Sequence, residues 1–424
     1  MSNIRKVCII DGARIPFCKS GTAYMRMSNK DLMSTALKGL VSKLNLQGKE
    51  VGEVSLGAVS KHAEDFALAR ECVIEAGLSF STPAFDIQKA CGTSLEAAVL
   101  IGNKIALGQI ECGIAGGVDT NSDIPVEFKK KFSDRLLELN NARTFGQRLS
   151  AFKGFSPKEL FPKLPAVKEA RTGLSMGQSC EQMAQRWEIK REDQDQLAFN
   201  SHQNAEKAYT EGFYDDLVVP CAGVKKDNIV RANTTLEKLA SLRTCFDKSE
   251  KATMTAANST PLSDGASCTF LCSEEYAKEN NLEVMAYLTY SQSAAVNYID
   301  DEGLLMAPAY AVPKLLKQAD MKLQDFDIYE IHEAFAAQVL CTLKSWESEE
   351  FCKEKLGLEA PLGEVDRSKL NLKGGSLALG HPFAATGTRI LTGLAKQLKE
   401  NGGGKGLISI CTAGGMGVTA IVER

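Results

Sequence analysis

The stretch AFDIQKACGTSLEAAVLIGNKIALGQIECGIAGGVDTNSD, residues 84–123, predicts five local elements in order. They are a strand, a tight turn at Cys91, a helix, a second strand and a glycine loop. The helix is indicated by apolar residues at helical spacing: Leu95, Ala98, Val99, Ile101 and Ile105. It should end near Gly108, and the strand at Cys112–Ala115 leads into Gly116 and Gly117.

A second stretch, GGSLALGHPFAATGTR at residues 374–389, opens the same pattern near the C-terminus. A loop with His381 precedes a helix to about Glu400, a strand at Leu407–Ile410 and the pair Gly414 and Gly415. Two copies of one α/β unit are therefore predicted. A pseudo-twofold axis between the copies would place Cys91 and His381 at equivalent helix N-termini, facing each other.

Length and composition indicate a soluble globular protein with two or three domains, or one duplicated domain. The chain has 424 residues, of which 44% are hydrophobic and 24% charged. Its net charge of −3 gives no reason to expect bulk binding to nucleic acid or anionic membranes. No apolar run approaches the ~20 residues that span a bilayer. The short apolar stretch before Asp11 reads as a first strand, not as a signal peptide.

The 13 cysteines favour reduced thiols and a cytoplasmic location. Their number is odd, and they form no C-x-x-C pair. Most are expected to be small buried hydrophobic residues. Two differ in their setting, namely Cys91 and Cys411.

Cys91 directly precedes a predicted helix, where free N–H groups and the helix dipole favour thiolate over thiol. A packed thiol at a tight turn explains this segment equally well. Cys411 ends a predicted strand and begins the glycine-rich loop CTAGGMG, at the sheet edge where α/β proteins place ligands. A histidine beside Cys91 would activate it as a nucleophile, which is the position that the repeat gives to His381.

The segment FDIYEIHEAFAAQVL places His332 between a predicted strand and a predicted helix. A structural histidine bonded to its own loop is one interpretation. Beside a reactive thiol, His332 would instead donate a hydrogen bond to a developing oxyanion, directly or through water.

Taken together, ACGTSLEA, HEAFAAQ, GGSLALGHPFAATG and CTAGGMG resemble the thiolase family. The match runs essentially end to end and also includes GARIPF and MTAANSTPLSDGAS. The resemblance is strongest to 3-ketoacyl-CoA thiolases (acetyl-CoA C-acyltransferases) of the trifunctional-enzyme β-subunit and bacterial anaerobic β-oxidation branch. It implies an α/β fold with two βαβαβαββ-type halves that form a five-layer αβαβα core.

The resemblance also implies domain boundaries. Residues 1–127 and 258–282 would form the N-terminal half, and residues 283–424 the C-terminal half. Residues 128–257 would be an inserted loop domain that covers the active site and holds coenzyme A.

By resemblance, Cys91 is the nucleophile that carries the acyl group, His381 its base and an oxyanion donor, and Cys411 the second acid/base. His332 stands where most thiolases have an asparagine that holds a catalytic water. Ala413 replaces the first glycine of the usual C-x-G-G-G, yet its backbone N–H still suits an oxyanion hole. Coenzyme A contacts are implied for four residues, with Thr260 in place of a common serine: Thr260, Met176, Arg231 and Phe335.

The implied reaction is thiolytic cleavage of a 3-ketoacyl-CoA by CoA, as in fatty-acid β-oxidation. CoA is a co-substrate, and neither a metal nor a tightly bound cofactor is implied. An acetoacetyl-CoA thiolase, which acts on C4 substrates in either direction, is the alternative within the family. A condensing ketoacyl synthase would share the fold but lack a C-terminal catalytic cysteine, so Cys411 argues against it. A non-catalytic lipid-transfer relative need not keep both cysteines and both histidines, so retention of Cys91, His332, His381 and Cys411 argues for an enzyme.

The sequence leaves the oligomeric state and the partner subunits more open than the fold and the reaction. A homodimer or homotetramer is implied, and the β-subunit branch works with an α-subunit that has hydratase and dehydrogenase activities. The segment 128–173 carries basic residues among apolar ones: Phe128, Phe132, Leu136, Leu139, Leu149, Phe152, Phe155 and Phe161. Its cationic run is either a solvated helix face, a partner surface or a site for CoA phosphates, and its apolar side chains either bind a partner or line the acyl tunnel.

Overall fold

The computed structural model describes residues 4–163, 168–300 and 302–424. Its two halves repeat one order of elements. The first half consists of β1 (Val7–Arg14), α1 (Asn29–Lys43), β3 (Glu53–Leu56), α2 (Leu68–Glu75), β4 (Ala84–Asp86), α3 (Thr93–Ala106), β5 (Cys112–Asp119) and β6 (Ser263–Ser273). The second consists of β7 (Ala286–Ala295), α10 (Ala307–Ala319), β8 (Ile328–Ile331), α11 (Ala336–Glu347), α14 (Thr386–Glu400), β9 (Lys405–Thr412) and β10 (Met416–Glu423).

Strand pairing confirms the duplication. The order across the sheet is β4-β3-β5-β6-β1 in the first half, followed by β7-β10-β9-β8 in the second. β3 pairs in parallel with β4 and β5, as β8 does with β9, and the other neighbours are antiparallel. In the second half, the place of β4 is held by one parallel bridge between Tyr329 and Leu370. Each half is thus the expected βαβαβαββ unit, and the halves join where Cys8 and Ile9 of β1 pair with β7.

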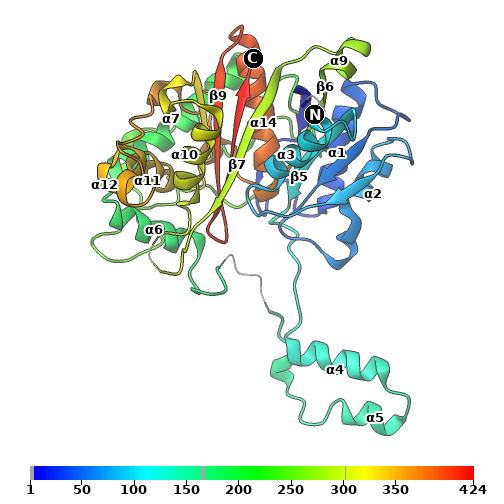
Figure 1. Cartoon of the computed structure of the whole chain (residues 1–424). Coiled ribbons are helices and arrows are strands. Elements are labelled where there is room, and N and C mark those ends of the chain that lie inside the picture. The colour runs from blue at the N-terminus through cyan, green and yellow to red at the C-terminus, as the bar shows by residue number, and fades with distance from the viewer. Residues whose placement is uncertain (1–3, 164–167, 301) are drawn as a thin grey trace.

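Three apolar cores stack as the expected five layers. α1 and α2 pack on the outer face of the first half-sheet. α10 and α11 pack on the outer face of the second. Between the half-sheets, α3 and α14 lie side by side at the centre of the molecule (Figure 1). Because both faces of the sheet are covered, β5 and β6 are buried along their whole length.

The N-terminal turns of α3 and α14 touch. A side chain at Gly387 of α14 would place its Cβ only 2.3 Å from the backbone nitrogen of Leu95 in α3. One residue on, the Thr388 N–H donates to Ser94 Oγ over 2.9 Å. Only glycine allows this approach, and the approach brings together the two loops that precede the helices.

The region 128–257 has two visibly different parts. α6 (Met176–Arg186), α7 (Arg191–Thr210) and α8 (Leu236–Ala240) pack on the second half, where α6 and α7 contact α11. α4 (Lys130–Asn141) and α5 (Phe145–Ser150) instead form a helical arm that extends away from the body (Figure 1). The boundaries of the inserted domain therefore stay a prediction.

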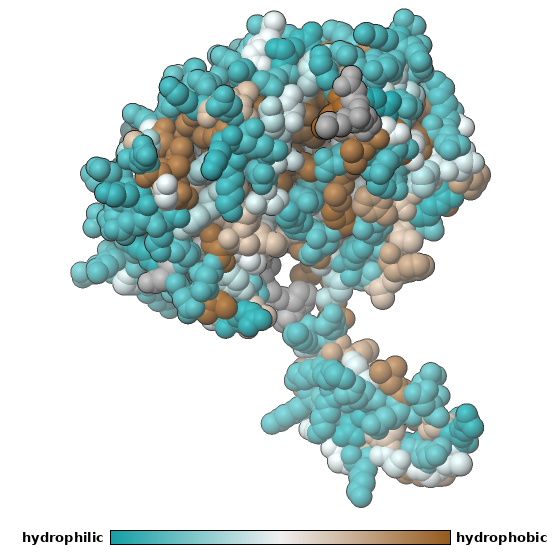
Figure 2. Space-filling model, in the orientation of Figure 1, coloured by the Kyte–Doolittle hydropathy of each residue, from teal (hydrophilic) through white to brown (hydrophobic). Residues whose placement is uncertain are grey.

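The arm has a small core of its own. Arg135 and Glu159 form a buried ion pair, with Nε and Oε2 2.7 Å apart, and Arg135 also donates to the carbonyl of Ala151 over 2.6 Å. The Phe132 ring is buried against Phe155. The apolar side chains that remain exposed are Val126, Phe128, Leu136, Leu137, Phe145, Leu149, Phe152, Leu160 and Phe161. Figure 2 shows such apolar groups among the polar surface of the arm.

The helix contact generates a stability test. Gly387→Ala is expected to lower the free energy of unfolding by about 1–3 kcal/mol or more, because the new methyl group overlaps the Leu95 backbone. Gly393→Ala in the same helix meets nothing within 4 Å and should raise stability by up to about 1 kcal/mol. Urea unfolding of both variants measures this, and equal midpoints would contradict the close contact.

Candidate active site

Three connections between elements bring Cys91, His332 and His381 together. Cys91 lies just before α3, His332 just after β8, and His381 in the loop before α14. The Cys91 sulfur and one ring nitrogen of each histidine all lie within 4.8 Å of one another. Cys91 keeps partial exposure, whereas both imidazoles are buried. The prediction that His381 faces Cys91 is confirmed by this geometry.

Both imidazoles are held by their Nδ1 atoms. His332 Nδ1 lies 2.9 Å from Ser376 Oγ, and His381 Nδ1 lies 2.6 Å from Thr386 Oγ1. The ring centroids are 4.2 Å apart. Both Nε2 atoms are buried and have no hydrogen-bond partner among the described residues. Two ring nitrogens are thus left to act on whatever occupies the space beside Cys91.

A relay from Arg389 favours one tautomer of His332. The Arg389 guanidinium donates from Nη2 to Ser376 Oγ over 3.1 Å, and arginine has no acceptor to offer. Ser376 accepts from Arg389, and Nδ1 of His332 is the one acceptor among its described contacts, which favours an O–H directed at Nδ1. An imidazole that accepts at Nδ1 carries its proton on Nε2. This arrangement makes His332 a hydrogen-bond donor toward Cys91.

Burial keeps the site uncharged at neutral pH. It lowers the pKa of His381 to about 3, with the charge of Arg389 as a further cause. It also lowers the pKa of His332 well below the usual value, assisted by His381 and Arg389. Burial raises the pKa of Cys91 to about 12. The resting pair is a neutral thiol beside a neutral imidazole.

The expectation that the helix N-terminus favours a Cys91 thiolate is therefore wrong for the resting protein. Hydrogen bonds from the backbone N–H groups of Ala413 and of Cys91 itself do lower the thiol pKa, as expected of such donors. Desolvation of the charged sulfur is the larger effect and acts in the opposite direction. A ring nitrogen of His381 lies within 4.8 Å of this thiol.

The end of β9 supplies the remaining groups. Cys411 is buried, and its pKa is raised well above the usual value by burial and by the nearby Cys91. Two residues on, the Ala413 N–H donates toward the Cys91 sulfur. Gly414 and Gly415 follow with positive φ angles of 77° and 69°, which turn the chain back into β10. The structure thus places Cys411 and Ala413 beside Cys91, as predicted.

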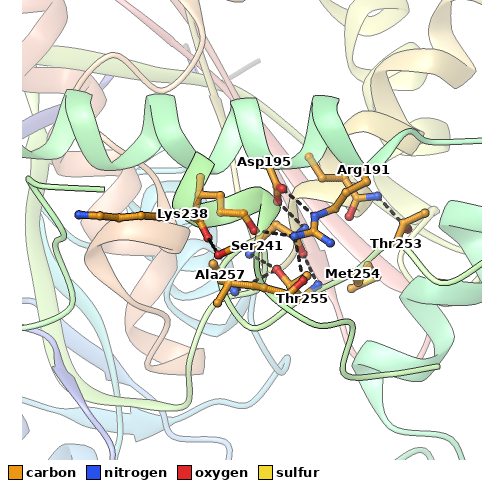
Figure 3. Close-up of polar contacts among 12 residues, drawn as sticks. Arg191, Asp195, Lys238, Ser241, Thr253, Met254, Thr255 and Ala257 are labelled. Atoms are coloured by element: carbon orange, nitrogen blue, oxygen red, sulfur yellow. Dashed lines mark hydrogen bonds and ion pairs between the residues drawn. The ribbon is translucent and has the colours of Figure 1, made fainter. Parts of the chain in front are cut away.

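A polar network of the inserted region holds the segment that precedes Thr260 (Figure 3). Arg191 donates to Asp195 over 2.6 Å, and Asp195 accepts from Asn258 over 3.0 Å. Glu181 accepts the backbone N–H groups of Thr253 and Met254 over 2.8 and 2.9 Å. These bonds fix the 253–258 segment, which leads directly into the loop that carries Thr260.

The four residues expected at coenzyme A have different settings. Thr260 donates its hydroxyl to the Ser376 carbonyl over 2.7 Å, which ties its loop to the histidine support. Phe335 begins α11 and packs edge-on against Phe246. Met176 begins α6 and packs on the core of the second half, and Arg231 is exposed. Coenzyme A binding by these residues stays a prediction.

Sequence reasoning missed the support of the two histidines. Ser376, Thr386 and Arg389 all lie in the stretch 374–389, but no role is predicted for them from the sequence. The available signal was their polarity: two hydroxyls and a cation in a segment whose other residues are almost all apolar or glycine.

Comparisons with known proteins identify the family of the chain. Residues 7–275 match the model of the thiolase N-terminal domain, and residues 282–424 that of the thiolase C-terminal domain. A 3-ketoacyl-CoA thiolase of Shewanella sp. (strain W3-18-1) is 43% identical, over 99% of this chain and 97% of the relative. A 3-ketoacyl-CoA thiolase of Shewanella baltica (strain OS155) matches with the same identity and coverage.

Solved structures show the same relationship. The Bacillus anthracis acetyl-CoA acetyltransferase superposes with a TM-score of 0.81 at 30% identity, covering 100% of both chains. Human mitochondrial 3-ketoacyl-CoA thiolase superposes with a TM-score of 0.80 at 25% identity, again over 100% of both chains. The duplicated fold, the placement of Cys91 against His381 and Cys411, and matches across nearly the whole chain lead to one conclusion: the protein belongs to the thiolase family.

Proposed function

We propose that the protein cleaves 3-ketoacyl-CoA with CoA, yielding acetyl-CoA and an acyl-CoA shortened by two carbons. It is thus an acetyl-CoA C-acyltransferase of fatty-acid β-oxidation. The observation that carries the proposal is the convergence of the Cys91 sulfur with one ring nitrogen each of His332 and His381. The full-length relatives at 43% identity are named 3-ketoacyl-CoA thiolase, which favours this substrate class. The structural relative named acetyl-CoA acetyltransferase keeps the C4 alternative open.

Acylation begins with proton transfer inside the neutral pair. His381 Nε2 takes the Cys91 proton as the sulfur attacks the 3-keto carbon. The C2–C3 bond then breaks, which leaves the acyl group on Cys91 and the electron pair on C2 of acetyl-CoA. Cys411 donates its proton to that carbanion and releases acetyl-CoA.

Thiolysis reverses these proton movements. The Cys411 thiolate takes the proton of an incoming CoA thiol, whose sulfur attacks the acyl-thioester on Cys91. The Cys91 thiolate leaves and recovers its proton from His381. The high pKa of Cys411 suits the first step, because a thiol that holds its proton tightly is a strong base once ionised.

Two oxyanions develop during the cycle, and the site offers donors for both. The enolate oxygen of acetyl-CoA would accept from His332 Nε2, directly or through water, and from protonated His381. The thioester oxygen would accept the backbone N–H groups of Cys91 and Ala413. Loss of one such donor typically costs ~3–4 kcal/mol of barrier. The Arg389–Ser376 relay suits this division, because it orients His332 as a donor while His381 stays a base.

Coenzyme A is assigned to residues of the inserted region and of both halves. We place it against Thr260, Phe335 and Met176, with the exposed Arg231 toward its phosphates. Residues 128–257 form the inserted domain, whose part outside the α4–α5 arm covers the site, with 1–127 and 258–282 as the N-terminal half and 283–424 as the C-terminal half. CoA is a substrate here, in keeping with the solved complex of human mitochondrial 3-ketoacyl-CoA thiolase with CoA.

The arm formed by α4 and α5 suits a partner subunit better than a cover for CoA. Its exposed side chains include Phe145 at 78% and Leu149 at 60% exposure, more apolar surface than a solvated hairpin needs. We propose that this arm docks an α-subunit with hydratase and dehydrogenase activities, in an assembly built on a homodimer or homotetramer.

A cytoplasmic location fits the cysteines, since all 13 lie in the described part of the chain and none forms a disulfide. Within the described residues, no helix is long and apolar enough to span a membrane.

A substrate series tests the reaction. Medium- and long-chain 3-ketoacyl-CoA should be cleaved with kcat/KM at least about tenfold above that for acetoacetyl-CoA, because added methylenes contribute apolar binding. The rate of acetyl-CoA formation with excess CoA measures this, with Cys91→Ala as the inactive control. Turnover confined to acetoacetyl-CoA would select the C4 alternative.

The pH dependence of alkylation tests whether the Cys91 thiol is neutral in the free enzyme. Iodoacetamide reacts with thiolate, so the alkylation rate of Cys91 in the free enzyme should rise about tenfold per pH unit between pH 6 and 9 without a plateau. Peptide mapping by mass spectrometry follows Cys91, with the exposed Cys245 as an internal control for reagent. A plateau below pH 8 would show a preformed thiolate and contradict the dominance of burial.

Paired substitutions test the arm. Phe145→Ser with Leu149→Ser should abolish co-purification of enoyl-CoA hydratase and 3-hydroxyacyl-CoA dehydrogenase activities from native extract, with ketoacyl-CoA KM unchanged. Phe80→Ser with Leu107→Ser is the matched control, because these body residues are 77% and 61% exposed. If only the KM changes, or if the wild-type chain elutes without either activity, the docking role is wrong.

A further inference from the structure

The cluster of Cys91, His332 and His381 has the composition of a metal site as well as of a catalytic site. It is the one group of three or more histidine, cysteine or acidic side chains in the described residues whose donor atoms converge within 4.8 Å. Both Nε2 atoms are buried and have no partner among these residues. Two unpartnered imidazole nitrogens and a sulfur face one small volume.

The donor types select the ion. Thiolate and imidazole are preferred ligands of Zn²⁺, which they bind at about 2.3 and 2.0 Å in tetrahedral geometry. Those lengths place neighbouring ligand atoms about 3.3–3.6 Å apart. The Cys91 sulfur and the two ring nitrogens lie within 4.8 Å of one another. They need to approach by little more than about 1 Å to reach the ligand spacing, which side-chain rotation can supply. Three protein ligands with an open fourth position is the pattern of accessible zinc sites.

The surroundings supply the outer contacts that metal-binding histidines require. Nδ1 of His381 is held by Thr386, and Nδ1 of His332 by Ser376. Such contacts orient the ring and leave Nε2 for the metal. Binding at Nε2 moves the His332 proton to Nδ1, where Ser376 Oγ can accept it, because a hydroxyl oxygen has two lone pairs.

We propose that Cys91, His332 and His381 form an inhibitory Zn²⁺ site, whose fourth position is open to water or a thiol. Zn²⁺ replaces the proton of the Cys91 thiol, which passes to solvent, and no electron is transferred. The sulfur is then a metal ligand and both Nε2 atoms are occupied. Nucleophile, base and oxyanion donor are blocked together.

The positive charge of Arg389 should weaken the binding of Zn²⁺ at this site. Its guanidinium is buried and donates to Ser376, which contacts His332 Nδ1, so a fixed positive charge lies beside the site. Zn²⁺ should therefore bind reversibly and more weakly than at a structural zinc site.

The other two histidines of the chain already have partners. His62 Nε2 contacts the Asp123 carbonyl, and His202 Nδ1 accepts from the backbone N–H of Arg231.

The test measures binding without relying on turnover. The full chain carries Cys245→Ser, which removes the exposed thiol. Zn²⁺ is titrated against a chelator of known affinity, and Cys91 alkylation is followed by mass spectrometry. We expect one Zn²⁺ per chain and alkylation slowed at least tenfold. With Co²⁺ in place of Zn²⁺, a sulfur-to-metal charge-transfer band should appear.

Two histidine variants supply the comparison. His332→Asn should weaken Zn²⁺ binding at least about 100-fold, since even loss of an outer contact costs 10–100-fold. His62→Asn should leave it unchanged. Equal Zn²⁺ affinity in His332→Asn and wild type, unprotected Cys91 at saturating Zn²⁺, or a Co²⁺ spectrum without sulfur ligation would each overturn the site.

Thiolysis assays on the same samples keep the two proposals apart. Inhibition that follows Zn²⁺ occupancy is the expected result. Cys91 protected by bound Zn²⁺ with undiminished turnover would overturn the inhibitory role and the proposed nucleophile, while the binding data would still establish the metal site.

Discussion

The contact between the first turns of α3 and α14 is the constraint on which the site depends. Each helix is entered from a loop that carries a reactive side chain, Cys91 before α3 and His381 before α14. Because Gly387 offers no side chain, the Leu95 backbone can occupy the space beside it. Ser94 then accepts one of the otherwise unpaired N–H groups at the start of α14. Packing and hydrogen bonding thus fix the distance between two loops far apart in sequence.

Burial determines the chemistry that this contact allows. A preformed thiolate–imidazolium pair would place two charges where water is excluded, at a substantial cost in desolvation. The protein instead keeps Cys91 and His381 neutral and separates charge only during reaction. Donors are already in place for the charges that then develop, including the N–H of Ala413.

The repeat was predictable from sequence because its strands and central helices have strong, regular apolar periodicity. The counterpart of β4 was not, because a single bridge at Tyr329 and Leu370 has no periodicity to detect. The sequence singled out Cys91, His381 and Cys411 through their positions at the ends of elements, and the structure places His381 and Cys411 beside Cys91; their catalytic roles are the proposal made above. The sequence predicted too low a pKa for the Cys91 thiol. A helix N-terminus can be recognised from the neighbouring residues, whereas the desolvation of the sulfur depends on the whole fold. The sequence missed Ser376 because its partners, His332 and Arg389, lie 44 and 13 residues away.

The two imidazoles have different proposed roles, His332 as a hydrogen-bond donor and His381 as a base. Both are buried, neutral and held at Nδ1 by a hydroxyl. They differ in whether another group donates a hydrogen bond to that hydroxyl. Arg389 donates to Ser376, so the serine proton turns toward His332 and makes it a donor. Among the described contacts, Thr386 Oγ1 meets only the His381 ring, so it can accept from Nδ1 and leave Nε2 with the lone pair of a base. Uncharged imidazole nitrogens are also good metal ligands, so the features that suit the proposed catalysis suit the proposed Zn²⁺ site as well.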